Sequence, residues 1–414
     1  MKYTSMKSIV LMLCLPIMLA GCGQKDSSFA AAPGDSRSRE YTVWSIRMAD
    51  SEMARRGDSL SFGGPNPKAK WEYTTGLFLK SLLDLWQATG DVKYLDYVTA
   101  VIDSYVEANG AIRTYKMTDF NLDKINSGKV LLRLYQITGQ EKYRLAADHL
   151  YEQLQRQPRT SDGGFWHKQR YPWQMWLDGI YMSGPFYAEY GAMFDRPMAF
   201  DDAVRQILLI DAHTRDPQTG LRYHGWDESR KQAWADSLSG CSPHFWGRAM
   251  GWYGMALVDV LDYLPDDGEN RSRVIDILND LLKAVAPYQD ESGLWYQVVD
   301  QGDRAGNYLE TSVSAMLVYT IAKAVNKGYA DQAYRDVAIK GFDGIINQMI
   351  RSDEDERISL TGICSVAGLG GDPYRDGSFE YYISEPVVAN DLKGVGPFIM
   401  AGIQMGQMQA AAAD

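Results

Sequence analysis

A helix-ending pattern recurs along the chain. The segment ATG-DVKYLDYV at 88–98 matches ITG-QEKYRLAA at 137–147, and a looser copy, NKG-YADQAYRDVA, spans 326–338. In the first two copies a helix-like segment stops at a glycine, the residue favoured just past a helix C terminus, and another helix begins directly afterwards. Self-similarity at roughly 50 residues predicts a repeated helical-hairpin unit, so the chain is constrained to an architecture of stacked helix pairs.

Apolar residues at helical spacing predict about twelve helices. We expect them at 44–56, 71–89, 92–108, 121–138, 141–157, 177–194, 199–214, 245–264, 271–286, 310–326, 330–349 and 389–408. Segments rich in small residues, such as 246–258, suit inner positions, whereas charged ones, such as 271–285, suit outer, half-solvated positions. Two concentric rings of six helices satisfy this alternation. The sequence therefore predicts an all-α fold, an (α/α)6 barrel, with an open solenoid of helical hairpins as the alternative.

Short turn-and-strand segments follow the later helix of several pairs. They read SDGGFWHK from 161, TGLRYHGWD from 219 and SGLWYQVVD from 292, and each predicts a small hairpin or extended loop. In a barrel of this kind the loops that enter the inner helices gather at one end. Several polar residues lie in or near such junctions, so we expect convergence there of Asp123, His167, Asp178, His224, His244 and Arg248.

The stretch 163–187, GGFWHKQRYPWQMWLDGIYMSGPFY, is aromatic and interrupted by Gly and Pro, unlike an ordinary core helix. It places Asp178 among Trp166, Trp173 and Trp176. Aromatic walls around one carboxylate suit stacking on sugar rings, and they desolvate an acid so that it stays protonated near neutral pH. The alternative is an aromatic core loop in which the aspartate merely caps the following helix.

A second carboxylate, Asp123 in TDFNLDKINSG, is expected at the start of a helix that Asp119 caps. Exposed N–H groups in a first helical turn stabilise the anion. Two carboxylates whose surroundings push their pKa values apart are typical of an acid and a base that divide the work. We therefore predict Asp178 as the proton donor and Asp123 as its ionised partner, although Asp123 alone also fits an ordinary helix-start residue.

Three of the five histidines, His167, His224 and His244, fall at these junctions, which favours a binding role over isolated structural roles. The sequence holds no HxxH, HxxxH or Cys/His pair at ligand spacing, so we predict no catalytic metal. It also lacks a nucleophile-elbow serine, a P-loop and a dinucleotide-binding fingerprint, and no cofactor is expected.

The motif WGRAMGW places Trp246 and Trp252 on either side of Arg248. An arginine binds a carboxylate in bidentate fashion while indole rings stack on a sugar. The alternative is a buried arginine paired with a structural acidic residue.

The N-terminal residues predict export. Lys2 and Lys7 precede a short apolar run at 8–20, which has the length of a signal peptide. The run ends in Leu-Ala-Gly-Cys, which resembles a bacterial lipobox and implies a lipid anchor on Cys22. We expect a lipoprotein signal peptide at 1–21 and an outer-membrane location that faces the periplasm. The alternatives are a location facing the cell surface and an ordinary secretory signal peptide in which Cys22 occurs by chance.

The segment 22–40 is expected to be a flexible tether, and 41–414 a single catalytic domain. The net charge of −11 argues against nucleic acid as a partner. Cys241 and Cys364 remain in the mature chain, and their pairing is left open.

Four motifs together resemble the unsaturated rhamnogalacturonyl hydrolases, glycoside hydrolase family 105, which are related to the unsaturated glucuronyl hydrolases of family 88. They are NLDKINSG from 121, GGFWHKxxYPxQMWLDGxYM from 163, YHGWDE from 223 and HFWGRAMGW from 244. The resemblance implies an (α/α)6 barrel and an unusual reaction. An aspartate protonates C4 of a C4=C5 double bond in the terminal sugar, water adds at C5, and the hemiketal collapses to release the neighbouring sugar.

In this resemblance Asp178 matches the general acid/base and Asp123 the second essential aspartate. Matched binding residues are His167, His224, Trp246, Arg248 and Trp252, to which we add Trp71, Tyr73, Tyr171 and His244. The expected partner is an unsaturated oligosaccharide released from rhamnogalacturonan. Three alternatives remain: an unsaturated glucuronyl hydrolase, a sugar 2-epimerase that uses paired histidines, and a non-catalytic glycan-binding lipoprotein.

Overall fold

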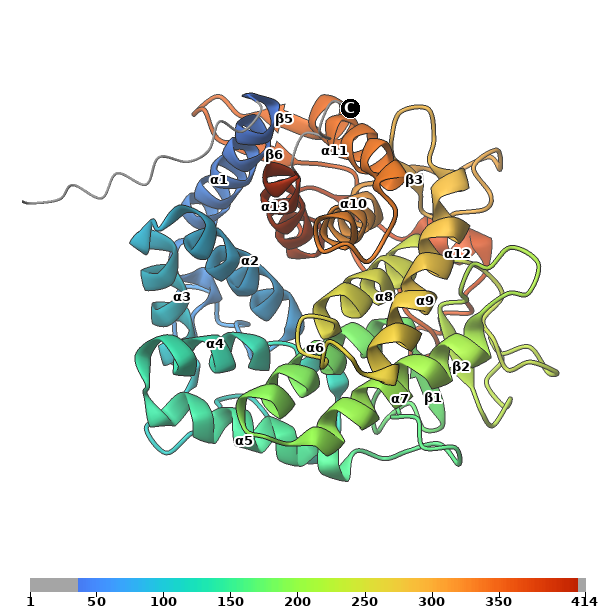
Figure 1. The fold of residues 1–414 in the computed structure, drawn as a ribbon, viewed down its shortest axis with the longest axis horizontal. Coiled ribbons are helices and arrows are strands. Elements are labelled where there is room, and N and C mark those ends of the chain that lie inside the picture. Colours follow the sequence, from blue (N-terminus) through green and yellow to red (C-terminus); the bar gives the residue numbers. More distant parts are fainter. Residues whose placement is uncertain (1–35, 409–414) are drawn as a thin grey trace, which may run out of the picture. The chain divides into compact units, whose positions relative to one another are not determined.

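The computed structural model describes residues 36–408 (Figure 1). Six of its helices form an inner ring in which each packs against the next and the last packs against the first. They are α2 (Tyr73–Thr89), α4 (Gly128–Thr138), α6 (Leu177–Met193), α8 (Gly247–Val260), α10 (Thr311–Asn326) and α13 (Leu392–Gln407). The inner ring is closed, which excludes the open solenoid.

Six further helices surround this ring, each against one inner helix. They are α1 (Ser36–Arg56), α3 (Val92–Tyr105), α5 (Glu141–Arg156), α7 (Pro197–Thr214), α9 (Glu269–Val285) and α11 (Arg335–Met349). Most outer helices follow their inner partner directly in the chain, whereas α1 packs against α13 from the other end of the chain. The described residues thus form an (α/α)6 barrel, as predicted.

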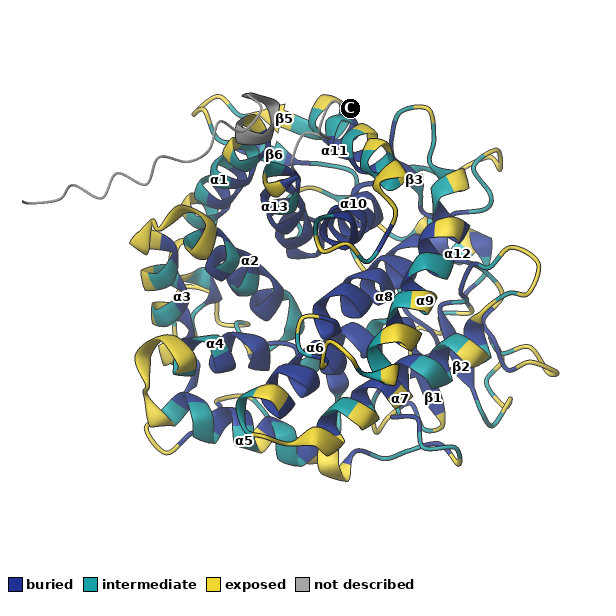
Figure 2. Cartoon of the chain, in the orientation of Figure 1, coloured by how far each residue is buried: buried dark blue, intermediate teal, exposed yellow. Residues whose placement is uncertain are grey.

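The two rings differ in burial, as the small-residue and charged patterns predict (Figure 2). Every residue of α8 is buried, whereas α9 buries only the side that faces the barrel. Glycine allows close approach in the inner ring. A Cβ atom on Gly76 would lie 2.5 Å from Cα of Ser127, and one on Gly251 would lie 2.8 Å from Cβ of Met316. Such contacts explain why inner helices are rich in small residues.

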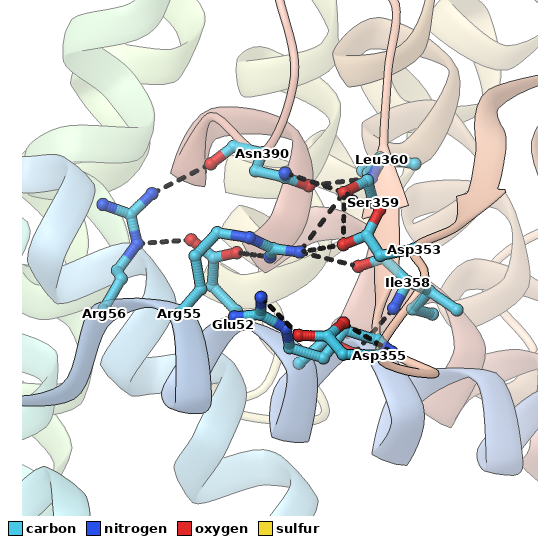
Figure 3. A network of polar contacts seen from close by, with 11 residues as sticks. Glu52, Arg55, Arg56, Asp353, Asp355, Ile358, Ser359, Leu360 and Asn390 are labelled. Carbon is cyan, nitrogen blue, oxygen red and sulfur yellow. Dashed lines mark hydrogen bonds and ion pairs between the residues drawn. The ribbon is translucent and has the colours of Figure 1, made fainter.

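A polar network joins helix α1, at the start of the described chain, to the segments that flank α11 and α13 near its end (Figure 3). Glu52 of α1 is fully buried and pairs with Arg55 (2.5 Å) and Arg56. Arg55 also reaches Asp353 (3.1 Å) beyond α11, and Arg56 donates a hydrogen bond to the carbonyl of Asn390 (2.9 Å), just before α13. The network therefore stabilises the position of α1, the outer helix that packs against α13.

Short antiparallel strand pairs lie in the loops. β1 (Gln174–Trp176) pairs with β2 (Gly225–Asp227), β3 (Trp295–Tyr296) with β4 (Leu309–Glu310), β5 (Ile350–Ser352) with β6 (Ile358–Leu360), and β7 (Ile363–Cys364) with β8 (Val387–Val388). The predicted stretches from 219 and 292 contain β2 and β3, whereas the one from 161 forms only isolated bridges, and β2 pairs with a strand from the preceding helical repeat. This pairing couples loops that are distant in the sequence.

Some predicted boundaries were wrong. The helix expected from 121 starts at Gly128, because 122–124 form a 3₁₀ turn capped by Asn121 and not by Asp119. Helix α1 begins at Ser36 and not at 44, since no Gly or Pro interrupts 36–43, and the division into tether and catalytic domain stays a prediction. The short helix α12 (Phe379–Ser384) was not predicted.

Within the described residues, Cys241 and Cys364 are buried free thiols. No helix in this part of the chain has the length and apolar character needed to cross a bilayer. The signal peptide at 1–21 and the anchor at Cys22 lie outside the described residues and stay predictions.

Candidate active site

Asp178 stands in the first turn of α6, directly after β1. The pairing of β1 with β2 brings the chain just before β2 to this turn, where the N–H of Leu177 donates a hydrogen bond to the carbonyl of His224 (3.1 Å). The side chains then meet: Nε2 of His224 lies 3.4 Å from Oδ2 of Asp178. Two loops from successive helical repeats therefore build one carboxylate–imidazole pair.

His224 is fully buried, whereas the side chain of Asp178 keeps 13% of its surface exposed. Nδ1 of His224 lies 2.8 Å from the hydroxyl of Tyr382, on α12. Burial raises the pKa of Tyr382 well above its ordinary value, so this phenol keeps its proton. Oδ2 of Asp178 and Nε2 of His224 have no hydrogen-bond partner among the described residues. The Tyr382 contact thus holds the His224 ring in place on the side away from Asp178.

Asp123 forms a second carboxylate–imidazole pair. Asn121 caps its N–H (3.0 Å), Nε2 of His167 lies 3.4 Å from its Oδ1, and the ammonium of Lys168 contacts its Oδ2. Burial acts to raise the pKa of Asp123, but Lys168 and then His167 oppose it, and the pKa falls below its usual value. Burial lowers the pKa of His167 to about 4. At neutral pH Asp123 is therefore an anion beside a neutral imidazole.

Trp176 joins the two pairs. The His167 ring stacks on it at 4.5 Å between centroids, and the His224 ring meets its edge at 5.4 Å. Tyr171 also stacks on Trp176 (5.0 Å). Arg375 donates a hydrogen bond to the hydroxyl of Tyr171 (2.9 Å). An aromatic wall thus spans the distance between Asp123 and Asp178.

A glycine next to Asp178 fits this packing. A Cβ atom on Gly179 would lie 2.9 Å from Nδ1 of His167, so a larger residue would displace that ring. Asp178 therefore supplies the carboxylate, and Gly179 leaves the space that the His167 ring occupies.

The WGRAMGW motif supplies an aromatic ring and a cation next to His224. Trp246 packs against His224 (4.6 Å), and Arg248 lies over the Trp246 ring (5.0 Å). Arg248 is itself buried; it donates hydrogen bonds to the carbonyl of Cys364 and to Ser312, with Glu310 4.0 Å away. Its Nε atom has no partner in the described part of the chain. Glu310 is thus a buried acidic residue near Arg248, as expected for an arginine with a structural role. The N–H at Nε remains available as a hydrogen-bond donor to a ligand.

Deeper in the barrel, Trp252 stacks on Tyr181 (5.0 Å) and meets Tyr73 edge-on (6.2 Å). Tyr73, Asp123 and Lys168 line a cavity of about 590 Å³, with Lys124 and Arg170 among the other lining residues. This volume accommodates a small ligand. Local cations line the cavity although the chain as a whole is acidic.

Two predicted binding residues do not contact this cluster. Trp71 is buried, and its indole donates a hydrogen bond to the carbonyl of Lys124 (2.8 Å), so it supports the loop that carries Asp123. His244 contacts Gln301 (2.9 Å) and Phe379, and burial lowers its pKa. The binding roles assigned to both residues stay predictions.

Three members of the cluster are absent from the predicted catalytic and binding residues, although Trp176 was expected in the aromatic wall around Asp178. Lys168 directly follows His167, and Trp176 stands two residues before Asp178, so proximity to a motif was an available signal for both. Tyr382 lies 158 residues from the histidine that it contacts, in a segment without a recognisable motif. Among residues 36–408, no three His, Cys, Asp or Glu side chains are grouped closely enough to hold a metal ion.

A closed helical barrel with two carboxylate–imidazole pairs beside an aromatic wall suits acid–base chemistry on a sugar, and comparison with known proteins identifies the class. The chain matches Glycosyl Hydrolase Family 88 over residues 44–409. A glycoside hydrolase of family 105 from Clostridium acetobutylicum ATCC 824 is 43% identical, with a TM-score of 0.85 over 88% of this chain and 99% of that chain. The protein thus belongs to the glycoside hydrolases of families 88 and 105, and it is a glycosidase.

Two further relatives are similar in sequence. The unsaturated rhamnogalacturonyl hydrolase YesR of Bacillus subtilis is 26% identical over 311 residues, which cover 74% of this chain and 83% of YesR. A protein of Agrobacterium fabrum is 43% identical over 226 residues, which cover 53% of this chain and 96% of that protein.

Proposed function

We propose that this glycosidase removes an unsaturated uronate from the non-reducing end of short oligosaccharides by hydrating the C4=C5 double bond. One observation carries the proposal: Oδ2 of Asp178 has no hydrogen-bond partner among the described residues and lies 3.4 Å from His224, whose ring meets the edge of Trp176. An alkene carbon needs one positioned carboxylic acid, and an aromatic plane binds the face of a sugar.

In the proposed reaction the carboxyl group of Asp178 gives its proton to C4. Water attacks C5 and returns a proton to the Asp178 carboxylate, which leaves a hemiketal with a new hydroxyl on C5. The hemiketal opens at the bond between C5 and the ring oxygen and becomes a C5 ketone. The hemiacetal left at C1 then expels the neighbouring sugar as an alcohol, and C1 becomes an aldehyde.

The other residues bind and orient the substrate. Asp123 is ionised and accepts hydrogen bonds from sugar hydroxyls, while Lys168 keeps it charged. The uronate carboxylate requires a cation, and Lys124, Lys168 and Arg170 line the same cavity as Asp123. We assign the carboxylate to this group and not to Arg248, whose guanidinium is bound by the carbonyl of Cys364 and by Ser312.

We further propose that the substrate is an unsaturated galacturonate linked to rhamnose, a product of rhamnogalacturonan lyases. The support is the similarity to YesR of Bacillus subtilis, whose name is unsaturated rhamnogalacturonyl hydrolase. An unsaturated glucuronyl substrate is the competing choice. A panel of lyase-generated disaccharides that differ only in the second sugar will rank the two by kcat/KM.

A pair of disaccharides tests the reaction itself. The unsaturated disaccharide should lose its ultraviolet absorbance and release the second sugar, whereas the saturated equivalent should remain intact. In D2O, deuterium should enter only one of the two positions at C4, because a fixed acid delivers it. Cleavage of both disaccharides at similar rates would contradict alkene hydration, and binding without turnover would favour a glycan-binding protein.

The N-terminal lipobox leads to a separate proposal on location: the mature chain is a lipoprotein of the outer membrane that faces the periplasm. Cys22→Ser should move the protein from the membrane fraction to the soluble one. Protease added to intact cells should leave the wild-type protein uncut, and digestion would instead place it on the cell surface.

A further inference from the structure

A second cavity, of about 510 Å³, lies within the barrel. It is lined by residues from five inner helices, α2, α4, α6, α10 and α13, and by Asp262 and Tyr263 just after α8. It shares none of its lining residues with the cavity that contains Asp123. The second cavity is therefore distinct from the candidate active site.

Three aromatic rings separate the two cavities. Tyr73, which lines the active-site cavity, meets Trp252, and Trp252 stacks on Tyr181. The ammonium of Lys129, which lines the second cavity, lies 3.6 Å from the centre of the Tyr181 ring. The rings of Tyr73, Trp252 and Tyr181 thus lie between the two cavities, and Lys129 contacts them from the second cavity.

The charges in the second cavity are unequally paired. Lys80 pairs with Asp84 (2.6 Å), and Lys323 with Asp259 (2.7 Å) and Asp262 (2.5 Å). Lys129 is only 2% exposed, and its ammonium has no hydrogen-bond partner within residues 36–408. Burial lowers the pKa of Lys129 to about 7, so an anion bound beside the ammonium would hold it in the charged form.

Arg133 stands one helical turn after Lys129 on α4 and lines the same cavity. Its guanidinium donates hydrogen bonds to Gln87 (2.6 Å) and Gln136 (3.5 Å), and it pairs with no carboxylate in the described chain. Glu189, a buried acid that lines the cavity, has its pKa raised to about 7 by burial, so it does not supply a full negative charge at neutral pH.

From this arrangement we propose that the second cavity binds a small oxyanion-bearing molecule, a carboxylate or phosphate no larger than a sugar acid, between Lys129 and Arg133. A volume of about 510 Å³ is that of a small-molecule site, and an anion there gives the buried Lys129 ammonium the hydrogen-bond partner that it lacks among the described residues. The hydroxyl of Tyr319 and the amides of Gln87 and Gln404 offer polar groups for the rest of the ligand.

The test compares galacturonate, inorganic phosphate and neutral galactose by thermal unfolding and calorimetry, at matched ionic strength. A ligand that binds the native state raises Tm in a concentration-dependent way. Galacturonate, phosphate or both should do so, and galactose should not. Galacturonate alone would indicate a sugar-acid site, whereas equal effects of both anions would indicate that the oxyanion suffices.

Variants locate the binding. Lys129→Met, which preserves side-chain length, should abolish the rise in Tm, and Arg133→Gln at the cavity edge should weaken binding by about tenfold or more. Lys340→Met on the exposed side of α11 is the matched control and should bind like the wild type. The proposal is overturned if neither anion binds, if galactose binds as well, or if Lys129→Met and Arg133→Gln bind like the control.

Discussion

Nε2 of His224 lies 3.4 Å from Oδ2 of Asp178, and neither atom has a hydrogen-bond partner among the described residues. Buried polar atoms without partners are rare in folded proteins and are found where a ligand or reaction supplies the missing contact. The pair is also anchored from behind, because Tyr382 holds the opposite ring nitrogen at 2.8 Å.

Asp178→Asn should remove the proton donor without changing the size of the side chain. We expect kcat on the unsaturated disaccharide to fall by about 10² to 10⁴-fold, the usual contribution of a general acid–base group, while substrate binding is retained. Ultraviolet kinetics and calorimetry measure the two quantities. Asp96→Asn on the exposed outer face of α3 is the control. Full activity of Asp178→Asn would contradict its assignment as the acid.

Tyr382→Phe tests whether the phenol orients His224. Because Tyr382 keeps its proton, it donates to Nδ1 in one tautomer, and Nε2–H then points at the Asp178 carboxylate. Loss of a single neutral hydrogen bond should lower kcat by about tenfold at most, with KM little changed. A fall in kcat/KM that comes entirely from a higher KM, with kcat unchanged, would indicate that Tyr382 acts only in substrate binding.

Lys168 controls the charge on Asp123. Burial acts to raise the pKa of this carboxyl group, and Lys168 is the strongest opposing influence. Lys168→Gln should therefore raise the pKa of Asp123, so the acid limb of the kcat/KM profile should move to higher pH. Lys168→Arg keeps the positive charge and should restore the wild-type limb. An unchanged limb in Lys168→Gln would show that ionised Asp123 is not required.

The barrel could be predicted from the sequence because its cause is local. A glycine-terminated helical hairpin repeats, and inner helices need small residues for contacts such as the one between Gly76 and Ser127. The meeting of Asp178 with His224 was also accessible, because both lie at junctions into inner helices. The ionised state of Asp123 was predicted from a helix terminus, although the larger cause is the ammonium of Lys168.

The remaining features depend on contacts between distant segments. No local pattern pairs β1 with β2, or places Tyr382 behind His224, because neither relationship leaves a period or motif in the chain. Arg248 shows the same limit. Its motif indicated ligand binding, but the identity of its neighbours depends on where Glu310 and Cys364 lie in the fold.

His167 should make stability depend on pH. Burial lowers its folded pKa to about 4 from the ordinary 6.5. Between these values the unfolded chain binds a proton that the folded protein excludes, so stability falls as pH drops from about 6.5 towards 4. The full loss is about 3 kcal/mol. Urea unfolding across this range should show a shallower decline in His167→Gln, whereas His149→Gln on the surface of α5 should keep the wild-type decline. Equal slopes in all three proteins would contradict a buried neutral His167.

Glu52 should be critical for closing the barrel (Figure 3). It is fully buried between Arg55 and Arg56, which also reach Asp353 and the carbonyl of Asn390. Glu52→Gln removes the charge that holds both arginines, and hydrogen bonds to charged groups contribute about 1.5–3 kcal/mol. The free energy of unfolding in urea should fall by that amount, and α1 should become more susceptible to proteolysis because it lies at the end of the barrel sequence. Glu40→Gln, at an exposed position of the same helix, should change stability by less than about 0.5 kcal/mol. If both variants unfold like the wild type, the packing of α1 against α13 closes the barrel without the network.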